Sequence, residues 1–151
     1  MSALVAALHH LGFLAIMLML AFEMLMLKQR FTLESAKKII RYDAIYGMAA
    51  GLILVIGGLR VMYFEKGAHY YLHSAPFFAK MALFILVGLI SIYPTVTFLK
   101  WNKSIKQGIL PTVTEAQTRK LRLVIHVELT LLGLMILCAV LMAKGIGYAD
   151  A

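Results

Sequence analysis

The sequence predicts an all-α integral membrane protein: a single domain over residues 1–151, built as an up-down-up-down bundle of four helices. Hydrophobic residues make up 62% of the chain and the mean hydropathy is +0.87, whereas soluble domains contain roughly 45–50% apolar residues. Four apolar runs, at about 3–27, 44–63, 73–99 and 121–143, each reach the roughly 20 residues that a helix needs to cross a bilayer. Too few residues remain for a water-soluble domain.

Lysine and arginine residues are concentrated in two of the three connections between these runs. The first connection contains Lys28, Arg30, Lys37, Lys38 and Arg41, and the third contains Lys100, Lys103, Lys106, Arg119, Lys120 and Arg122. The second, around residues 64–72, contains only Lys66. Cytoplasmic loops are enriched in these residues, so both termini are predicted to lie outside the cytoplasm. The net charge of +8 then reflects topology and contact with anionic lipid, and no nucleic-acid partner is predicted.

Residues in and before the first two runs indicate how each helix begins and how the second one packs. No lysine or arginine precedes the first run, and the run is too long for the apolar region of a signal peptide, so a retained helix is predicted. Thr32 and Ser35 predict a short, capped amphipathic helix on the membrane surface, ahead of the second spanning helix. In that second helix, Gly47 and Gly51 form a small-xxx-small pair suited to close helix packing.

The last two runs are bounded by residues that start, bend or stop helices. Ser74 followed by Pro76 predicts the start of the third spanning helix, because proline is tolerated in a first turn. Pro94 predicts a kink near the cytoplasmic end of that helix. Gly108 is expected to break the following connection, and the tail after Lys144 is expected to be mobile.

Ionisable side chains inside the runs fall into two layers. At about 1.5 Å per residue, His9 and His10 lie roughly 9–10 Å inside the outer boundary and Lys80 lies roughly 9 Å inside it. The opposite, inner layer comprises Glu23, Asp43, Arg122, His126 and Glu128. Ionisable groups at membrane depth are costly to bury, so they mark candidate functional sites.

Helical register separates the two adjacent histidines. At about 100° per residue, His9 lies about 40° from Glu23 around the helix and His10 about 140° from it. With Glu23 facing the bundle interior, His9 is predicted to face inward and His10 is not. On the third spanning helix, one stripe contains Lys80, Phe84, Gly88, Ser91 and Thr95. That stripe is predicted to be an inner face, so His9 and Lys80 are expected to look into one cavity.

The same groups also have structural interpretations. Lys80 can extend its ammonium group toward the interface, and His9 can bond to a neighbouring helix. In the inner layer the acids and bases are expected to form ion pairs that tie the helices together, with a proton path as the alternative. Cys138 is expected to be a small apolar packing residue. The i, i+2 spacing of several methionines argues against a copper cage.

Motifs of soluble enzymes, such as a nucleotide-binding glycine loop, paired cysteines or HExxH, are lacking in the sequence. Ligand or cofactor binding between helices is therefore the main chemical option. Four-helix bundles commonly hold haem through an inward histidine that serves as an axial ligand.

Several short segments resemble known membrane families. Ala7–His9 and Phe78–Met81 resemble HemJ-type protoporphyrinogen oxidases and, in the wider group, CopD-like membrane proteins. The whole chain more closely resembles an uncharacterised bacterial family of small four-helix membrane proteins, through Tyr42–Gly47, Tyr63–Gly67 and Ile92–Thr95. The first resemblance implies a functional histidine and lysine at His9 and Lys80 with haem b as cofactor. The second implies a multi-pass protein of the bacterial inner (cytoplasmic) membrane.

The resulting hypothesis is a membrane protein that binds haem b between its helices and is redox-active, as a haem-dependent membrane oxidoreductase would be. His9 is the expected axial ligand, and Lys80 is the second ligand or a propionate partner. His10 and His73 are further ligand candidates. The expected propionate partners at the outer boundary are Arg60, Tyr63 and Lys66. The alternatives are a cofactor-free accessory subunit, which packs against a partner or a second copy through the glycine-rich face of the second helix, and a small transporter that uses both layers.

Overall fold

The computed structural model describes residues 2–64 and 68–148, and within them the chain forms an all-helical bundle. The four long helices are α1 (Ser2–Lys28), α2 (Leu33–Leu59), α4 (Ala75–Lys106) and α5 (Glu115–Ala143). Two short elements, the π-helical turn η1 (Arg60–Phe64) and the helix α3 (Ala68–Leu72), lie between α2 and α4. All four long helices are long and apolar enough to cross a membrane. The predicted fold class is confirmed.

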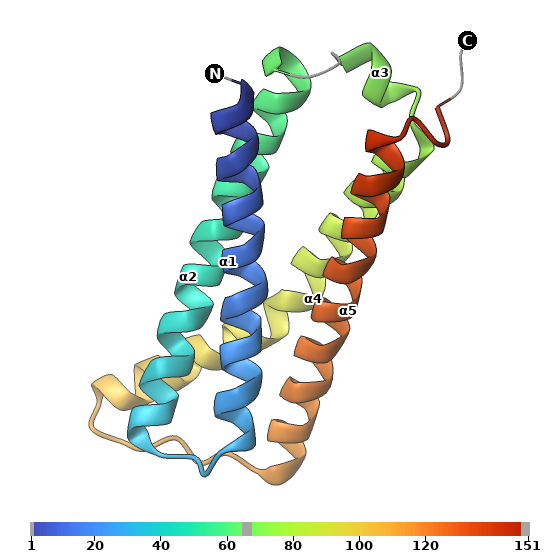
Figure 1. Cartoon of the computed structure of the whole chain (residues 1–151). Coiled ribbons are helices and arrows are strands. Elements are labelled where there is room, and N and C mark those ends of the chain that lie inside the picture. Colours follow the sequence, from blue (N-terminus) through green and yellow to red (C-terminus); the bar gives the residue numbers. More distant parts are fainter. Residues whose placement is uncertain (1, 65–67, 149–151) are drawn as a thin grey trace.

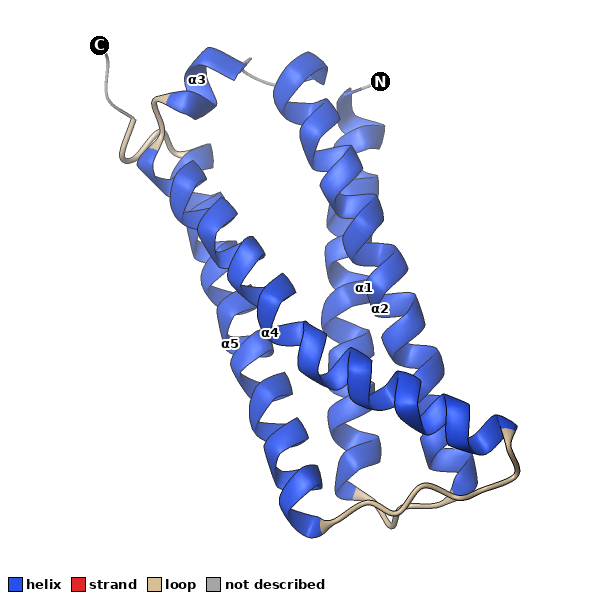
Figure 2. Cartoon of the chain, turned by 180° about the vertical axis from the view of Figure 1, so that it is seen from behind, coloured by secondary structure: helices blue, strands red, loops and turns tan. Residues whose placement is uncertain are grey.

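The four long helices are arranged as two pairs, α1 with α2 and α4 with α5 (Figures 1 and 2). The start of α1, η1, α3 and the end of α5 lie at one end of the molecule, which we call the termini end. The α1–α2 and α4–α5 connections lie at the opposite end, which we call the loop end. The two pairs are close together at the loop end and diverge toward the termini end in both views.

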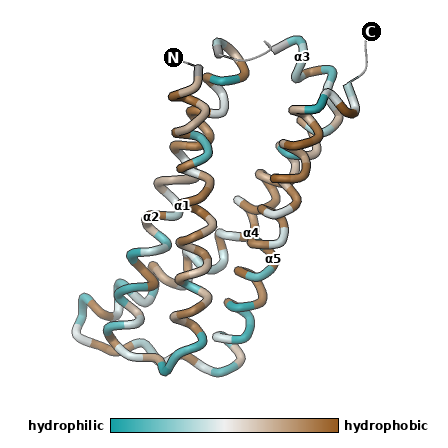
Figure 3. Tube along the Cα trace, viewed as in Figure 1, coloured by the Kyte–Doolittle hydropathy of each residue, from teal (hydrophilic) through white to brown (hydrophobic). Residues whose placement is uncertain are grey.

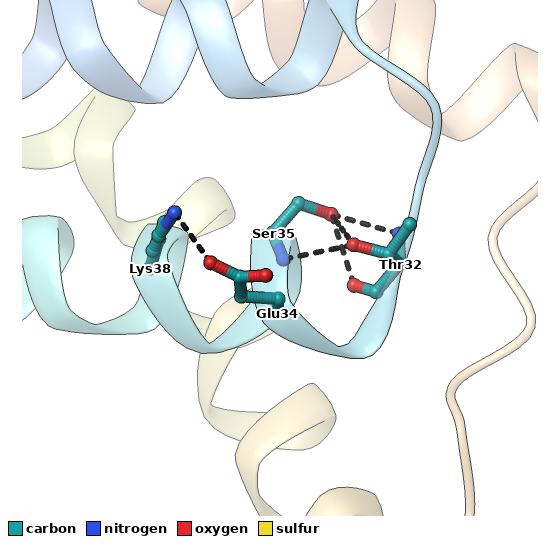
Figure 4. A network of polar contacts seen from close by, with 4 residues as sticks. All are labelled: Thr32, Glu34, Ser35 and Lys38. Carbon is teal, nitrogen blue, oxygen red and sulfur yellow. Dashed lines mark hydrogen bonds and ion pairs between the residues drawn. The ribbon is translucent and has the colours of Figure 1, made fainter.

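The second spanning helix begins earlier than expected. The segment predicted to form a separate surface helix is instead the first part of α2, which runs without interruption from Leu33 to Leu59. Thr32 is the predicted N-cap: the Ser35 amide donates to its Oγ1 at 3.1 Å, and its own amide donates to Ser35 Oγ at 2.8 Å (Figure 4). This reciprocal capping box satisfies two backbone donors that the helix leaves free. No helix breaker follows it, so the helix continues into the spanning region.

The third spanning helix, α4, contains Pro94 within its length and changes direction along its course in Figures 1 and 2. Proline removes one backbone hydrogen bond and crowds the preceding turn, which accounts for the predicted kink. The helix continues to Lys106, beyond its predicted end near residue 99. Gly108, the expected breaker, follows the cap with a φ of 76° in the left-handed region. The amide of Ile109 then donates to the carbonyl of Ser104 at 3.0 Å, as in a Schellman cap.

Residues 145–148, which follow α5, fold back onto the start of α4, contrary to the expected mobile tail, and residues 149–151 of that tail lie outside the described residues. The amide of Ala75 donates to the carbonyl of Gly147 at 3.0 Å, and Ser74 pairs with Tyr148 in an isolated antiparallel bridge. The ring of Tyr148 stacks on Tyr70 of α3, with 4.7 Å between centroids. We call this set of contacts the C-terminal clasp. The stacked ring of Tyr148 and the tight turn at Gly147 (φ 78°) hold these residues in place. Composition alone did not predict these contacts.

The core is formed by one apolar stripe from each long helix. The members are Ile16, Leu20 and Leu27 of α1, Ile39, Tyr46 and Ile53 of α2, Val87, Phe98 and Trp101 of α4, and Leu121, Ile125, Leu132 and Met135 of α5. Hydrophobic residues also cover the outward faces of these helices, whereas hydrophilic residues gather at the loop end (Figure 3). This is the distribution that a helix bundle surrounded by lipid requires.

Candidate functional site

Three basic side chains converge toward the termini end from three different elements. His9 of α1 interacts electrostatically with Lys80 of α4 and with Arg60 at the end of α2, and Lys80 also interacts with Arg60. All three side chains are partly buried. We call them the basic cluster. The structure thus brings His9 and Lys80 within electrostatic range of one another, and Arg60 joins them from the predicted outer boundary. The expectation that both look into one cavity stays a prediction, since neither lines the cavity between α2 and α4.

The two adjacent histidines differ as the helical register predicted. His9 is partly buried, and its Nδ1 has no hydrogen-bond partner among the described residues. Its ring packs against Gly57 of α2, where an added Cβ would lie 3.3 Å from the His9 Cε1. His10 is exposed, and its Nδ1 lies 2.6 Å from the carbonyl oxygen of Ala6. Only His9 thus presents an unused ring nitrogen toward the bundle.

The other candidates at the termini end are not all drawn into the basic cluster. Tyr63 is 73% exposed. The Nδ1 of His73 lies 2.8 Å from the carbonyl oxygen of His69, and the two rings are 4.3 Å apart. No contact between His73 and His9 is formed in the described part of the chain. Lys66 lies outside the described residues.

Cys138 of α5 is a neighbour of the basic cluster that the sequence did not indicate. It is partly buried and interacts electrostatically with Lys80. Each of the four long helices, or its direct continuation, therefore contributes a polar or sulfur-bearing side chain to this region. The sequence did not indicate this position of Cys138, because a single cysteine among Leu, Ile and Ala is typical of an apolar packing residue.

Three carboxyl groups converge in the core between the basic cluster and the loop end. Glu23 of α1, Asp43 of α2 and Glu128 of α5 are only 1%, 9% and 0% exposed. Glu23 interacts electrostatically with both other acids, and Glu128 interacts with Asp43. We call these three residues the acidic cluster.

Each acid of this cluster occupies the core stripe of its own helix. Glu23 lies between the buried Leu20 and Leu27, one turn from the former and one from the latter. Glu128 lies in the same way between Ile125 and Leu132. Spacings of three and four residues place these side chains on one helix face, so the apolar packing of the core forces the carboxyl groups inward.

The inner-layer bases do not take part in the acidic cluster. Arg122 and His126 are exposed, and neither forms an ion pair within residues 2–64 and 68–148. They lie on α5, about 120° and about 160° around the helix from Glu128. The expected ion pairs between inner-layer acids and bases are therefore not formed, because a shared depth does not give a shared face.

Two further polar residues border the acidic cluster. The hydroxyl of Thr95 on α4 donates to Asp43 Oδ1 at 2.8 Å, and Tyr46 of α2 is buried and interacts electrostatically with all three acids. A cavity of about 440 Å³ lies between α2 and α4, and its wall includes Asp43, Tyr46, Ser91 and Thr95. Four members of the predicted inner stripe of α4 line this cavity, namely Phe84, Gly88, Ser91 and Thr95, whereas Lys80 does not. The core residues Val87 and Phe98 of α4 line it as well.

The glycines of α2 differ in whether they contact another helix of the described chain. Gly57 packs against His9, whereas Gly47, Gly51 and Gly58 have open space where a side chain would be. The small-xxx-small pair is thus not used for packing against another described helix of this chain. Among the described residues, no group of three or more His, Cys, Asp or Glu side chains is placed to hold a metal ion.

Comparison with known proteins places the chain in a family. No curated protein and no solved structure matches it significantly. The family model described as a predicted membrane protein, DUF2214, matches residues 1–147. That match covers all four long helices and both polar clusters, and it agrees with the resemblance to a family of small four-helix membrane proteins. The chain belongs to the DUF2214 family of predicted membrane proteins.

Proposed function

We propose that this membrane protein binds haem b at the basic cluster, with His9 as an axial ligand. The observation that carries the proposal is the buried Nδ1 of His9, which has no hydrogen-bond partner among the described residues. A polar atom buried in this way costs about 1–3 kcal/mol unless a ligand or water satisfies it. Coordination of iron by the imidazole would remove that cost.

The residues around His9 fit the chemistry of a haem group. Haem brings two negatively charged propionates, and Arg60 and Lys80 supply positive charge beside the imidazole from two other elements. Charge-assisted bonds from such groups to carboxylates are among the stronger polar contacts. Gly57 leaves the imidazole room on the side of α2, because any side chain there would press against the ring.

Bound haem would supply one-electron redox chemistry. The chain's own part is to position and tune the group: His9 holds the iron, and Arg60 and Lys80 set the local positive charge. Lys80 serves either as the second ligand or as a propionate partner. The distant resemblance to HemJ-type oxidases makes protoporphyrinogen-type oxidation the narrower form of this proposal.

The test is the absorption spectrum of protein purified from a haem-replete host. We expect a Soret band and a b-type reduced-minus-oxidised spectrum. His9→Ala should abolish both, because loss of the imidazole removes the bond to iron and leaves only packing of the macrocycle. Lys80→Met should shift the band or the potential if Lys80 ligates iron, and should only weaken retention if it binds a propionate.

His10→Ala is the matched control, because this histidine is adjacent in sequence but exposed. It should retain most of the haem. Size-exclusion chromatography of each variant separates loss of ligand from loss of fold. Full haem retention in a folded His9→Ala variant would remove the proposed ligand. A colourless wild-type protein after haem supplementation would favour the accessory-subunit alternative, for which the open glycine face of α2 would be the contact surface.

A further inference from the structure

The acidic cluster contains three carboxyl groups and lacks a compensating cation. The ionisable and hydroxyl side chains that form or border the cluster are Glu23 from α1, Asp43 and Tyr46 from α2, Ser91 and Thr95 from α4, and Glu128 from α5. No lysine, arginine or histidine of the described chain faces it. The nearest bases along α5 are exposed, and the Lys120 ammonium lies over the Tyr93 ring, 4.5 Å from its centroid.

The deepest two members of the cluster have no hydrogen-bond partners. Both carboxyl oxygens of Glu23 and both of Glu128 are buried without a partner in the described part of the chain. Asp43 alone receives a hydrogen bond, from Thr95. Buried polar groups in native proteins are nearly always satisfied. Glu23 and Glu128 interact electrostatically, and their four oxygens have no partner among the described residues. Such a pair is stable in the core only when its charge is neutralised.

The repulsion between the three acids is relieved by positive charge. Three carboxylates at membrane depth would repel one another in a medium that screens poorly, and a charged side chain there is costly even when alone. Like-charged carboxyl groups that share a site relieve this repulsion by holding a proton between them. A proton needs only one carboxylate oxygen to bind, whereas a metal ion needs several ligands placed around it.

We propose that Glu23, Asp43 and Glu128 form a proton-binding site, which fills from the cavity between α2 and α4 through Asp43. Each uptake transfers one proton from a hydronium ion in that cavity to a carboxylate oxygen, which leaves a water molecule and a neutral carboxyl group. This site is separate from the proposed haem site at the basic cluster, since His9 and Glu23 are about 21 Å apart along α1.

The order of transfer follows from the position of the three acids. Asp43 is the only one that lines the cavity, and the same cavity continues past Ile40 and Leu99 to Asn102, toward the loop end. Glu23 and Glu128 lie behind Asp43, in the core. Protons from the loop end therefore meet Asp43 first and reach the glutamates second.

The first test is labelling with dicyclohexylcarbodiimide, an apolar reagent that takes the proton of a carboxyl group and then bonds to its oxygen. Peptide mass spectrometry of wild-type protein in lipid vesicles should find the adduct on Glu128 or Glu23, with a yield that falls several-fold as pH rises. Glu34 and Glu115 are exposed in ion pairs and serve as internal controls that should stay unlabelled. Absence of an adduct in the cluster at low pH would overturn the proposal. Protection by sodium at constant pH would overturn it as well, because it would assign the site to an alkali cation.

The second test follows the infrared carbonyl band of protonated carboxyl groups after a pH jump. The wild-type protein should show the band, Glu128→Gln should lose part of it, and Glu115→Gln should leave it unchanged. Asp43→Asn should slow the response to the pH jump several-fold while the band persists, because the glutamates remain but their route is interrupted. An unchanged rate in folded Asp43→Asn would rule out the proposed route. A wild-type protein without the band would rule out the proton site itself.

Discussion

The basic and acidic clusters lie in the same four-helix bundle but differ in charge, exposure and hydrogen bonding. In the basic cluster, His9, Arg60 and Lys80 are each only partly buried, although the Nδ1 of His9 is itself buried without a partner among the described residues. In the acidic cluster, Glu23 and Glu128 are sealed in the core, and all four of their carboxyl oxygens lack a partner. One region thus has polar residues that reach the surface, and the other has polar residues enclosed by packing.

The difference shows where each region can respond to a ligand. Arg60 and Lys80 are partly exposed and can be hydrated when no ligand is bound, so the cost of an empty basic cluster is confined to the buried Nδ1 of His9. Enclosed carboxyl groups have no such outlet, and their burial reduces the stability of the fold. The acidic cluster is therefore the region in which stability and function should oppose one another.

The largest expected effect concerns the side of the membrane that each cluster faces. A reporter fused at the C-terminus should be active outside the cytoplasm, and one inserted near Gly108 should be active inside, because the lysines and arginines are concentrated at the loop end. The acidic cluster would then open toward the cytoplasm through its cavity and the basic cluster toward the outside. The reverse reporter pattern would exchange the two sides and contradict the depths assigned to both clusters.

The second effect is on stability. Glu128→Met should raise the free energy of unfolding in detergent by about 1–3 kcal/mol, because it replaces an unsatisfied buried carboxyl group by an apolar side chain of similar size. Lys80→Met, the matched change in the basic cluster, should stay within about 0.5 kcal/mol. Thermal unfolding of both variants in the same detergent measures the contrast. Equal stabilisation by the two changes would mean that the clusters do not differ in how tightly they are sealed.

The smallest expected effect is a coupling energy. Glu23→Gln and Glu128→Gln should be non-additive by about 1 kcal/mol in a double-mutant cycle, because the two side chains interact. Glu23→Gln combined with His126→Ala should be additive within about 0.5 kcal/mol, since His126 is exposed on another face. Non-additivity in the second pair would restore the ion-pair interpretation of the inner layer.

Helical register explains which parts of the sites were predictable. The inward direction of His9 could be predicted because Glu23, on the same helix, fixed the interior face. The isolation of His126 from Glu128 was predictable from the same rule, since residues two apart on a helix point in nearly opposite directions. The expectation of ion pairs in the inner layer used only the shared depth of these residues and not the helix face on which each lies. The lack of a separate surface helix at residues 32–40 follows from the absence of any breaker between Thr32 and the apolar run.

Other features depend on contacts between distant segments, which one sequence does not reveal. The approach of Cys138 to Lys80 requires the relative rotation of α4 and α5. The bond from Thr95 to Asp43 depends on where α4 crosses α2, beyond the kink at Pro94. The cavity beside it results from the angle between the same two helices. Periodicity assigns a face to each helix but does not assign the neighbour that the face meets.

The C-terminal clasp has a consequence for the order in which the chain is assembled in the membrane. Gly147 and Tyr148 leave the ribosome more than 70 residues after Tyr70 and Ala75, so the clasp cannot form until all of α4 and α5 has been synthesised. Both helix pairs can therefore be inserted before α3 is held in place. The contacts of the C-terminal clasp, which include the stacked tyrosines and the bond from Ala75 to Gly147, therefore form last, after α5 has crossed the bilayer. A nascent chain halted before Gly147 would have its spanning helices inserted while α3 still awaits its partner.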